Sequence, residues 1–212
     1  MKSWYLRIKP YLTDTAFLRS VAIGIVLLAA SLFVNFYAGL YATERASNAV
    51  TDVILSNIPV FDVDGLFVWG TLGFWIIAGL LGLGHPRKIP FALKNIALFI
   101  LIRSVFITLT HIGPFPTHLA IDSNIIHKFT FGGDLFFSGH TGLPFLLALI
   151  FWEDVRLRIF FIASAILFGI VVLLAHLHYS IDVLSAFFIT YSIFKIATIF
   201  FKKDYEHCRE TD

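Results

Sequence analysis

Charged side chains are scarce in this 212-residue sequence: Asp, Glu, Lys and Arg make up only 14% of it. A typical soluble domain carries about 25%. Apolar residues make up 58% of the chain, and 24 residues are phenylalanine. A soluble domain of this length has too little interior for so many large apolar side chains, so lipid must solvate many of them. The sequence therefore predicts an integral membrane protein.

Cysteine and net charge are also low. The single cysteine, Cys208, excludes an internal disulfide and any metal site built from several cysteines. The formal net charge is only +2, which argues against a nucleic-acid partner. We accordingly expect the protein to bind no nucleic acid. We also expect neither a metal nor a cofactor.

Six apolar stretches can be marked along the chain. Each is predicted to be a helix, because an isolated strand cannot satisfy its backbone hydrogen bonds in lipid. The stretches are approximately Phe17–Tyr41, Leu66–Leu83, Phe91–Thr110, Ser138–Trp152, Leu157–Ala175 and Ser180–Phe201. The fourth is short, so we expect its outer end to lie in protein or in a water-filled recess. The predicted fold class is an all-α integral membrane protein with six transmembrane helices.

The basic residues predict the orientation of these helices. On a six-helix path, most Lys and Arg fall on one side, which the positive-inside rule makes cytoplasmic, so both termini are expected inside. Only Arg45 and Lys128 fall on the other side. The run Val21–Ala42 is long enough to span a bilayer and is interpreted as a signal anchor. We divide the chain into a cytoplasmic segment (1–20), a membrane catalytic domain (21–201) and a cytoplasmic tail (202–212).

Histidines gather on the opposite, non-cytoplasmic side of this arrangement. Six of the eight fall there: His111, His118, His127, His140, His176 and His178. Histidine is tolerated at membrane interfaces, so any one of these residues can lie there without a chemical role. Their clustering on a single face favours a shared chemical role there.

Two segments carry the candidate chemistry: GGDLFFSGHT at 132–141 and AHLHYSID at 175–182. The fourth and fifth helices form a hairpin between them, so both segments return to one membrane face. The fourth and sixth helices then point their N-terminal ends, with free N–H groups, at that face. Ser138 and Ser180 are predicted as their N-caps. A phosphate could bind between two such ends.

The side chains of these segments divide into roles. His178 and Asp182 are four residues apart, so the carboxylate can hold one ring nitrogen protonated and free the other as a nucleophile toward phosphorus. His140 could protonate the departing alcohol and later deprotonate the acceptor. His140, His178 and Asp182 are therefore the predicted catalytic residues. Asp182 could instead be only an acidic residue at a helix N-terminus, and this alternative stays open.

Four further residues are predicted to bind substrate: Arg103, Asp134, Ser138 and Tyr179. Arg103 lies inside the third helix, where an arginine requires an anion, and a substrate phosphate is one. An ion pair of Arg103 with Asp134 or Asp182 is equally compatible with the sequence. Asp134 follows a glycine pair and can also be a simple turn residue.

The segments at 132–141 and 176–183 resemble the third and fourth signatures of the sphingomyelin synthases, which fall within the type 2 phosphatidic acid phosphatase superfamily. The stretch 101–108 around Arg103 is a weaker match to another signature. The resemblance covers roughly residues 95–195. It implies that His140, His178 and Asp182 form a catalytic triad, and that a head group is transferred through a phosphohistidine at His178 without metal.

Two departures from the wider superfamily matter. Its phosphatases carry an Arg six positions before the second motif's His, where this chain has Val172. Their lysine-containing first motif is missing as well. The resemblance thus implies a phosphodiester donor, with phosphocholine or phosphoethanolamine moving from a glycerophospholipid to a lipid alcohol such as ceramide.

Several alternatives remain open at this point. Water as acceptor would make the protein a phospholipase C, and a phosphatidate or polyprenyl phosphate substrate would make it a lipid phosphatase. A transporter or scramblase would instead use the intramembrane charges as a pathway, and a metal could bind at His176, His178 and Asp182. The head group, the acceptor, the organism and any homo-oligomer are not determined by the sequence.

Overall fold

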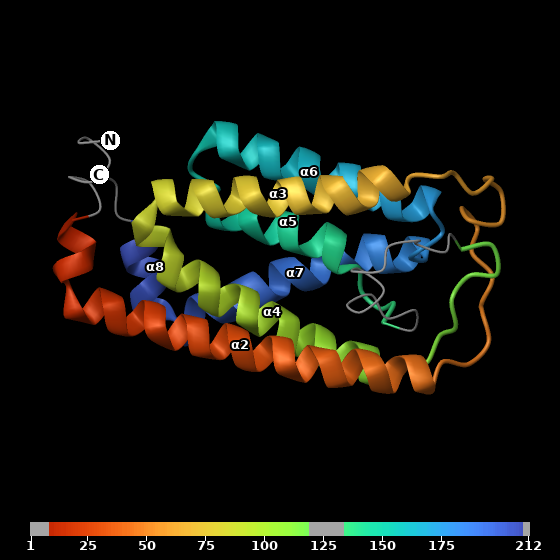
Figure 1. Cartoon of the computed structure of the whole chain (residues 1–212), viewed down its shortest axis with the longest axis horizontal. Helices are drawn as coiled ribbons and strands as arrows, with labels where there is room; N and C mark the ends of the chain where they lie inside the picture. The colour runs from red at the N-terminus through yellow and green to blue at the C-terminus, as the bar shows by residue number, and fades with distance from the viewer. Residues whose placement is uncertain (1–8, 119–133, 210–212) are drawn as a thin grey trace.

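The computed structural model describes residues 9–118 and 134–209, and the regular structure within these ranges is helical (Figure 1). The elements are α2 (Thr15–Glu44), α3 (Asp64–Gly84), the 3-10 helix η1 (Pro86–Lys88), α4 (Ile89–Leu109), α5 (Gly139–Ile150), α6 (Val155–Leu174), α7 (Ser180–Phe200) and α8 (Lys202–Arg209). The predicted all-α class is confirmed for the described residues.

Five stretches in the described ranges are long and apolar enough to cross a membrane: α2, α3, η1 with α4, α6 and α7. This is compatible with a multi-pass membrane protein. The fourth predicted span corresponds to α5, which has only 12 residues. At 1.5 Å per residue it extends about 18 Å, less than the ~30 Å of a hydrocarbon core. The expected number of six transmembrane helices therefore stays a prediction.

Polar side chains fix where three of the helices begin. Asp14 caps α2 by accepting hydrogen bonds from the N–H groups of Ala16 and Phe17. Asp154 caps α6 in the same way, and the Ser138 hydroxyl accepts from the Thr141 N–H at the start of α5. These side chains satisfy N–H groups that have no partner inside the helix.

α5 is the central helix of the bundle and packs against α4, α6 and α7. Its close approach depends on Gly142, where an added Cβ would lie 2.7 Å from the Phe99 ring and 2.9 Å from Thr190 Oγ1. On one side of this core α2 packs along α4, and on the other α3 packs against α6 (Figure 1).

The two ends of the bundle differ. α5 and α7 begin at one end, where the backbone N–H of Ser138 donates to the carbonyl of Asp182 at 3.1 Å. The loop from α2 to α3 and the segment after α4 lie at this same end (Figure 1). We call it the site end. η1 and α8 lie at the opposite end (Figure 1).

Candidate active site

The start of α5 presents two backbone donors that have no acceptor among the described residues. Ser138 is the N-cap, and its hydroxyl accepts from the Thr141 N–H at 3.4 Å. Within the described ranges, no acceptor is hydrogen-bonded to the N–H of Gly139 or His140. A Cβ built on Gly139 would lie 3.5 Å from Arg103 Nε. The helix end and the guanidinium thus face the same small volume.

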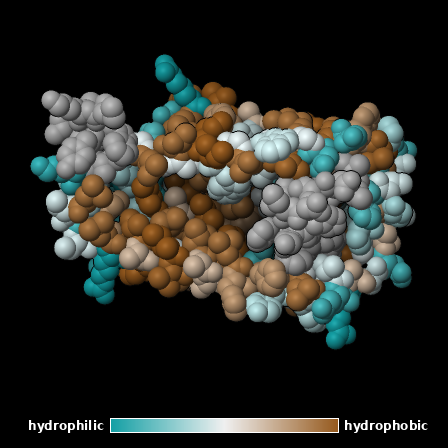
Figure 2. All heavy atoms as spheres, viewed as in Figure 1, coloured by the Kyte–Doolittle hydropathy of each residue, from teal (hydrophilic) through white to brown (hydrophobic). Residues whose placement is uncertain are grey.

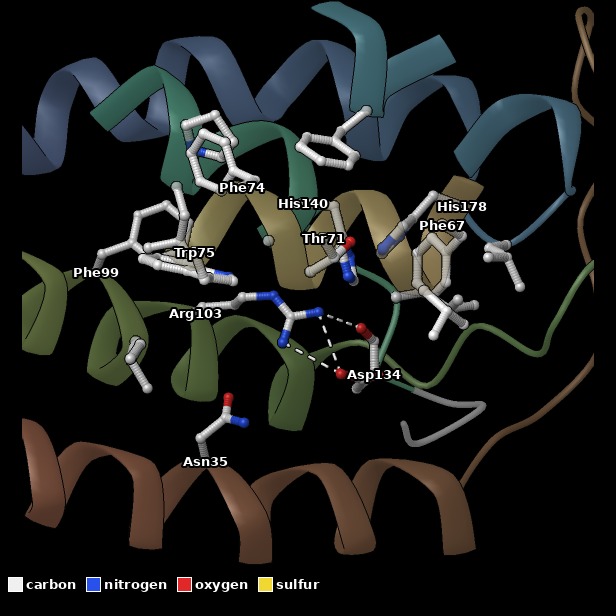
Figure 3. A pocket seen from close by; sticks show the side chains of 18 of the residues that line it. Asn35, Phe67, Thr71, Phe74, Trp75, Phe99, Arg103, Asp134, His140 and His178 are labelled. Carbon is white, nitrogen blue, oxygen red and sulfur yellow. Dashed lines mark hydrogen bonds and ion pairs between the residues drawn. The ribbon is translucent and has the colours of Figure 1, made fainter. Parts of the chain in front are cut away.

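Arg103 is buried in α4 and is held by the segment that leads into α5. Its Nε donates to the carbonyl of Phe137 at 2.8 Å, and Nη1 and Nη2 lie 3.2 Å and 3.3 Å from Asp134 Oδ2. Nη2 also donates to the Asp134 carbonyl. The sequence left open whether Arg103 pairs with a substrate phosphate or with a carboxylate of the protein. The structure contains the ion pair with Asp134 (Figure 3). The pair leaves little unbalanced positive charge at this point.

His178 is backed by a carboxylate. Its Nδ1 lies 3.4 Å from Asp182 Oδ2, a long hydrogen bond, and the same oxygen accepts from the Tyr179 N–H at 2.9 Å. Asp182 is fully buried, and its Oδ1 has no partner among the described residues. A carboxylate in this position fixes the ring and its tautomer, as required of a nucleophilic histidine.

His140 lies beside His178 although the two are 38 residues apart. Their ring centroids are 6.5 Å apart, and Phe67 of α3 packs on His140 at 4.5 Å. Figure 3 shows the two imidazoles together at one wall, with Arg103 and Asp134 opposite. An atom placed between the histidines could exchange a bond with one and a proton with the other.

The expected N-cap of α7 is wrong. Tyr179 occupies the N-cap position, and Ser180 is the first helical residue. Asp52, from the loop between α2 and α3, accepts from the Ser180 N–H at 2.7 Å and from its hydroxyl at 2.8 Å. Asp52 and Asp182 already accept hydrogen bonds from the backbone N–H groups at the start of α7. The N–H groups available to a phosphate are therefore chiefly those at the start of α5. The two helix ends converge as predicted, but side chains already occupy N–H groups at the start of α7.

Asp52 itself is nearly buried. Its other oxygen accepts from the N–H groups of Ile54 and Leu55. Burial alone would raise the pKa of this carboxyl, but the hydrogen bonds from Leu55, Ser180 and Ile54 outweigh it and lower the pKa below 3.8. Asp52 therefore connects the loop to the start of α7 as an ionised group.

α6 ends in a Schellman motif that places the second histidine segment. The N–H groups of His176 and Leu177 donate to the carbonyls of Leu173 and Val172, respectively. His176 has φ 54°, a conformation that glycine usually supplies at this position. Its Nδ1 lies 2.6 Å from Thr117 Oγ1, its Nε2 has no partner in the described ranges, and burial lowers its pKa. Burial therefore favours the neutral form of His176, which lies next to the site.

Tyr179 does not line the cavity. Its hydroxyl donates to the carbonyl of Gly113 at 2.8 Å and accepts from the Val50 N–H at 3.2 Å. Burial raises its pKa, so the phenol stays protonated. Gly113 cannot carry a side chain here, because a Cβ would meet the Ser47 carbonyl at 2.3 Å. Tyr179 thus joins two loops above the site.

A cavity of about 690 Å³ extends from these groups into the bundle. Most of its wall is apolar, and Phe74, Trp75 and Phe99 lie at the end away from the histidines (Figure 3). Leu32, Leu72 and Trp75 line it and are also exposed on the apolar outer surface. Figure 2 shows this face hollowed among hydrophobic side chains. The cavity therefore opens sideways, where lipid would lie.

Four of the predicted residues line this cavity together: Arg103, Asp134, His140 and His178. Asp182 stands behind His178, while Ser138 is buried as the cap of α5. Asn35 and Thr71 also line the cavity, and Asp52 accepts from the start of α7; the sequence analysis did not identify these three residues. A polar residue within an apolar span was the available signal for Asn35 and Thr71. Nothing marked Asp52, whose role depends on a contact across 128 positions.

In the part of the chain that the structure describes, no group of three His, Cys, Asp or Glu side chains is placed to hold a metal ion. His127 and Lys128 lie outside the described residues.

Fold and site together define a class. A helical, lipid-facing bundle encloses an apolar cavity, and two histidines, a buried carboxylate and an arginine meet at its polar end. These are the groups expected of an enzyme that acts on the phosphate of a lipid.

Comparison with known proteins gives a match over part of the chain. A family model described as PAP2 superfamily C-terminal matches residues 132–199, which include both histidine segments. The match supports the type 2 phosphatidic acid phosphatase superfamily, and with it a lipid phosphatase or phosphotransferase, but it does not single out the sphingomyelin synthases. No curated protein and no solved structure matches the chain.

Proposed function

We propose that this protein is a phospholipid head-group phosphotransferase with an activity like that of the sphingomyelin synthases. Phosphocholine or phosphoethanolamine leaves a glycerophospholipid and passes to a lipid alcohol such as ceramide, or to water. The observation that carries the proposal is the pairing of His178, backed by Asp182, with His140 across one laterally open cavity.

Transfer takes place in two halves. His178 Nε2 attacks phosphorus while Asp182 accepts a hydrogen bond from Nδ1–H, so that an N–P bond forms and the bond from phosphorus to the glycerol oxygen breaks. His140 gives its proton to that oxygen, and diacylglycerol leaves. In the second half His140 takes the proton of the acceptor hydroxyl, whose oxygen attacks phosphorus as the N–P bond breaks.

The charges around the cavity support a phosphodiester donor. A phosphomonoester carries nearly two negative charges at neutral pH, whereas a phosphodiester carries one. Among the described residues that line the cavity, Arg103 is the only Lys or Arg, and Asp134 is paired with it. The N–H groups at the start of α5 add about half a positive charge. This arrangement suits a monoanion better than a dianion.

Val172 supports the same choice. It stands where the superfamily's phosphatases keep an arginine, and here it is fully buried in an apolar cluster with Phe67 and Val171. No cation from that position can reach a phosphate. The shape of the cavity also suits a two-chain lipid, because its exposed apolar mouth lets acyl chains stay outside the protein.

Donor preference tests the proposal. Turnover is measured on phosphatidylcholine, phosphatidylethanolamine and phosphatidate in the same mixed micelles containing ceramide, with lipid products identified by mass spectrometry. His178→Ala serves as the blank. We expect the phosphodiesters to be consumed faster and a sphingophospholipid to appear. If phosphatidate is consumed tenfold faster, or if no donor is turned over above the blank, the transferase function is wrong.

A further inference from the structure

The opposite end of the bundle contains a second cavity, of about 400 Å³. Its existence follows from the length of α5. α5 and α7 start together at the site end, but α5 has 12 residues and α7 has 21, so α7 continues for about 13 Å beyond the end of α5. The space below the last turn of α5 is bounded by α7, η1 and α8.

Basic and aromatic side chains line this space. The basic ones are Lys88, Lys195 and Arg209, and Glu153 is the single carboxylate among the described lining residues, which gives a net charge of +2. Each cation lies over a ring: Lys88 over Phe151 at 5.4 Å, Lys195 over Tyr191 at 5.4 Å, and Arg209 over Tyr205 at 5.8 Å. Such contacts fix the direction of long, flexible side chains.

The cations differ in how far they are already engaged. Lys88 Nζ donates to the carbonyl of Ile150 at 3.2 Å and to that of Cys208 at 3.3 Å, so it terminates α5 and holds α8. Arg209 Nε lies 2.8 Å from Glu153 Oε1. Lys195, by contrast, has no hydrogen-bond or ion-pair partner within residues 9–118 and 134–209. It is the charge available to a ligand.

The wall of the cavity is anchored. Lys94, which is almost fully buried in α4, lies 2.6 Å from Asp204 of α8 and 2.7 Å from Ser20 of α2. This buried ion pair fixes α8 against two other helices. The cavity is therefore a feature of the folded bundle and does not depend on a loose terminal helix.

We propose that this second cavity binds the phosphate of an anionic glycerophospholipid. The phosphate lies near Lys195, within reach of the positive field of Lys88 and Arg209. One acyl chain runs along Phe145, Leu149 and Tyr191, which line the space between α5 and α7. Basic pockets between membrane helices bind anionic head groups in this way. The site is separate from the proposed transfer reaction, because α5 lies between the two cavities.

Binding is tested on the full chain, purified and stripped of lipid. Native mass spectrometry measures the fraction of protein that carries phosphatidylglycerol or phosphatidylcholine at increasing lipid concentration. Phosphatidylcholine is a proposed donor for the first cavity, so each lipid is compared between the wild type and variants of the second cavity, which leave the first cavity unchanged. We expect Lys195→Gln to weaken phosphatidylglycerol binding about fivefold and to leave phosphatidylcholine binding unchanged, while Lys195→Arg retains both.

Lys203→Gln is the matched control. Lys203 is exposed on α8 at the same end but does not line the cavity, and its substitution changes the net charge equally. If both variants weaken binding alike, the attraction is diffuse and the site does not exist. An equal loss of phosphatidylcholine binding in Lys195→Gln would also refute it, as would full displacement of phosphatidylglycerol by millimolar inorganic phosphate. No outcome depends on turnover, so failure here is distinct from failure of the proposed function.

Discussion

Replacing Asp52 with Ala should destabilise the bundle although Asp52 lies in a loop. Its carboxylate accepts four hydrogen bonds at 2.7–3.0 Å, from the N–H groups of Ile54, Leu55 and Ser180 and from the Ser180 hydroxyl. At about 0.5–1.5 kcal/mol for each bond, and with some donors gaining water instead, the loss is about 2–4 kcal/mol. For a chain of this size that corresponds to a fall in Tm of roughly 5–12 °C.

Thermal unfolding in detergent, followed by tryptophan fluorescence, measures this effect. Asp62→Ala is the control, because Asp62 is exposed in the same loop and, among the described residues, accepts only one bond, at 3.3 Å, from the Asp64 N–H. It should change Tm by less than 1–2 °C, roughly the value of an exposed hydrogen bond. Equal shifts in the two variants would show that the bridge from the loop to α7 contributes no stability.

The pH dependence of the Asp52 contribution has a definite sign. The pKa of Asp52 is lowered in the folded protein, so the unfolded chain takes up the proton first as pH falls. The stabilisation is complete above the ordinary value of 3.8 and is lost as pH falls through the folded-state pKa. The difference in Tm between wild type and Asp52→Ala should therefore be constant near neutral pH and shrink below about pH 4.

Four further predictions concern the site. His178→Ala should abolish turnover and leave Tm within about 2 °C, since removal of a nucleophile need not disturb the fold; more than a few per cent of residual activity would exclude His178. His140→Ala should regain activity on a donor with a good leaving group, because less proton donation is then needed; an equal loss on both donors contradicts its role as acid. Turnover should persist in excess chelator; a loss of turnover that a divalent ion restores would instead support a metal site. In a Cys208→Ser background, an impermeant thiol reagent should label Asn57→Cys in intact cells but not Arg156→Cys; the reverse pattern would invert the orientation.

Much of the helical framework could be predicted from composition and hydrophobic runs. The six predicted stretches each fall on a helix, with ends displaced by a few residues. α2 extends further than expected because Asp14 caps it before the apolar run begins. Caps of this kind are short-range and could have been read from the sequence. The short fourth stretch also indicated in advance that α5 would not span a full hydrocarbon core.

The candidate site was less predictable, because its details depend on long-range contacts. The hairpin argument brought His140 and His178 together by topology alone. It could not show that Asp52 would take up the first N–H of α7, nor that Tyr179 would be committed to two loops. Arg103 had two equivalent partners in the sequence, and only the packed segment before α5 favours Asp134. Local periodicity contains none of this information.

The depth of Arg103 in the bundle affects whether water or a lipid hydroxyl reaches the site as acceptor. Arg103 lies six residues before the end of α4, about 9 Å below it, and Asn35 lies nine residues before the end of α2, about 14 Å below. Arg103, and with it the start of α5 that it contacts, is thus recessed beneath the ends of α2 and α4. For the proposed transferase, water must descend from the rim whereas a lipid hydroxyl arrives through the side opening at the same level. The phosphohistidine then reacts either with water that enters from the rim or with a lipid hydroxyl that enters from the side. Narrowing one of these two routes would change the ratio of hydrolysis to transfer without altering the catalytic groups.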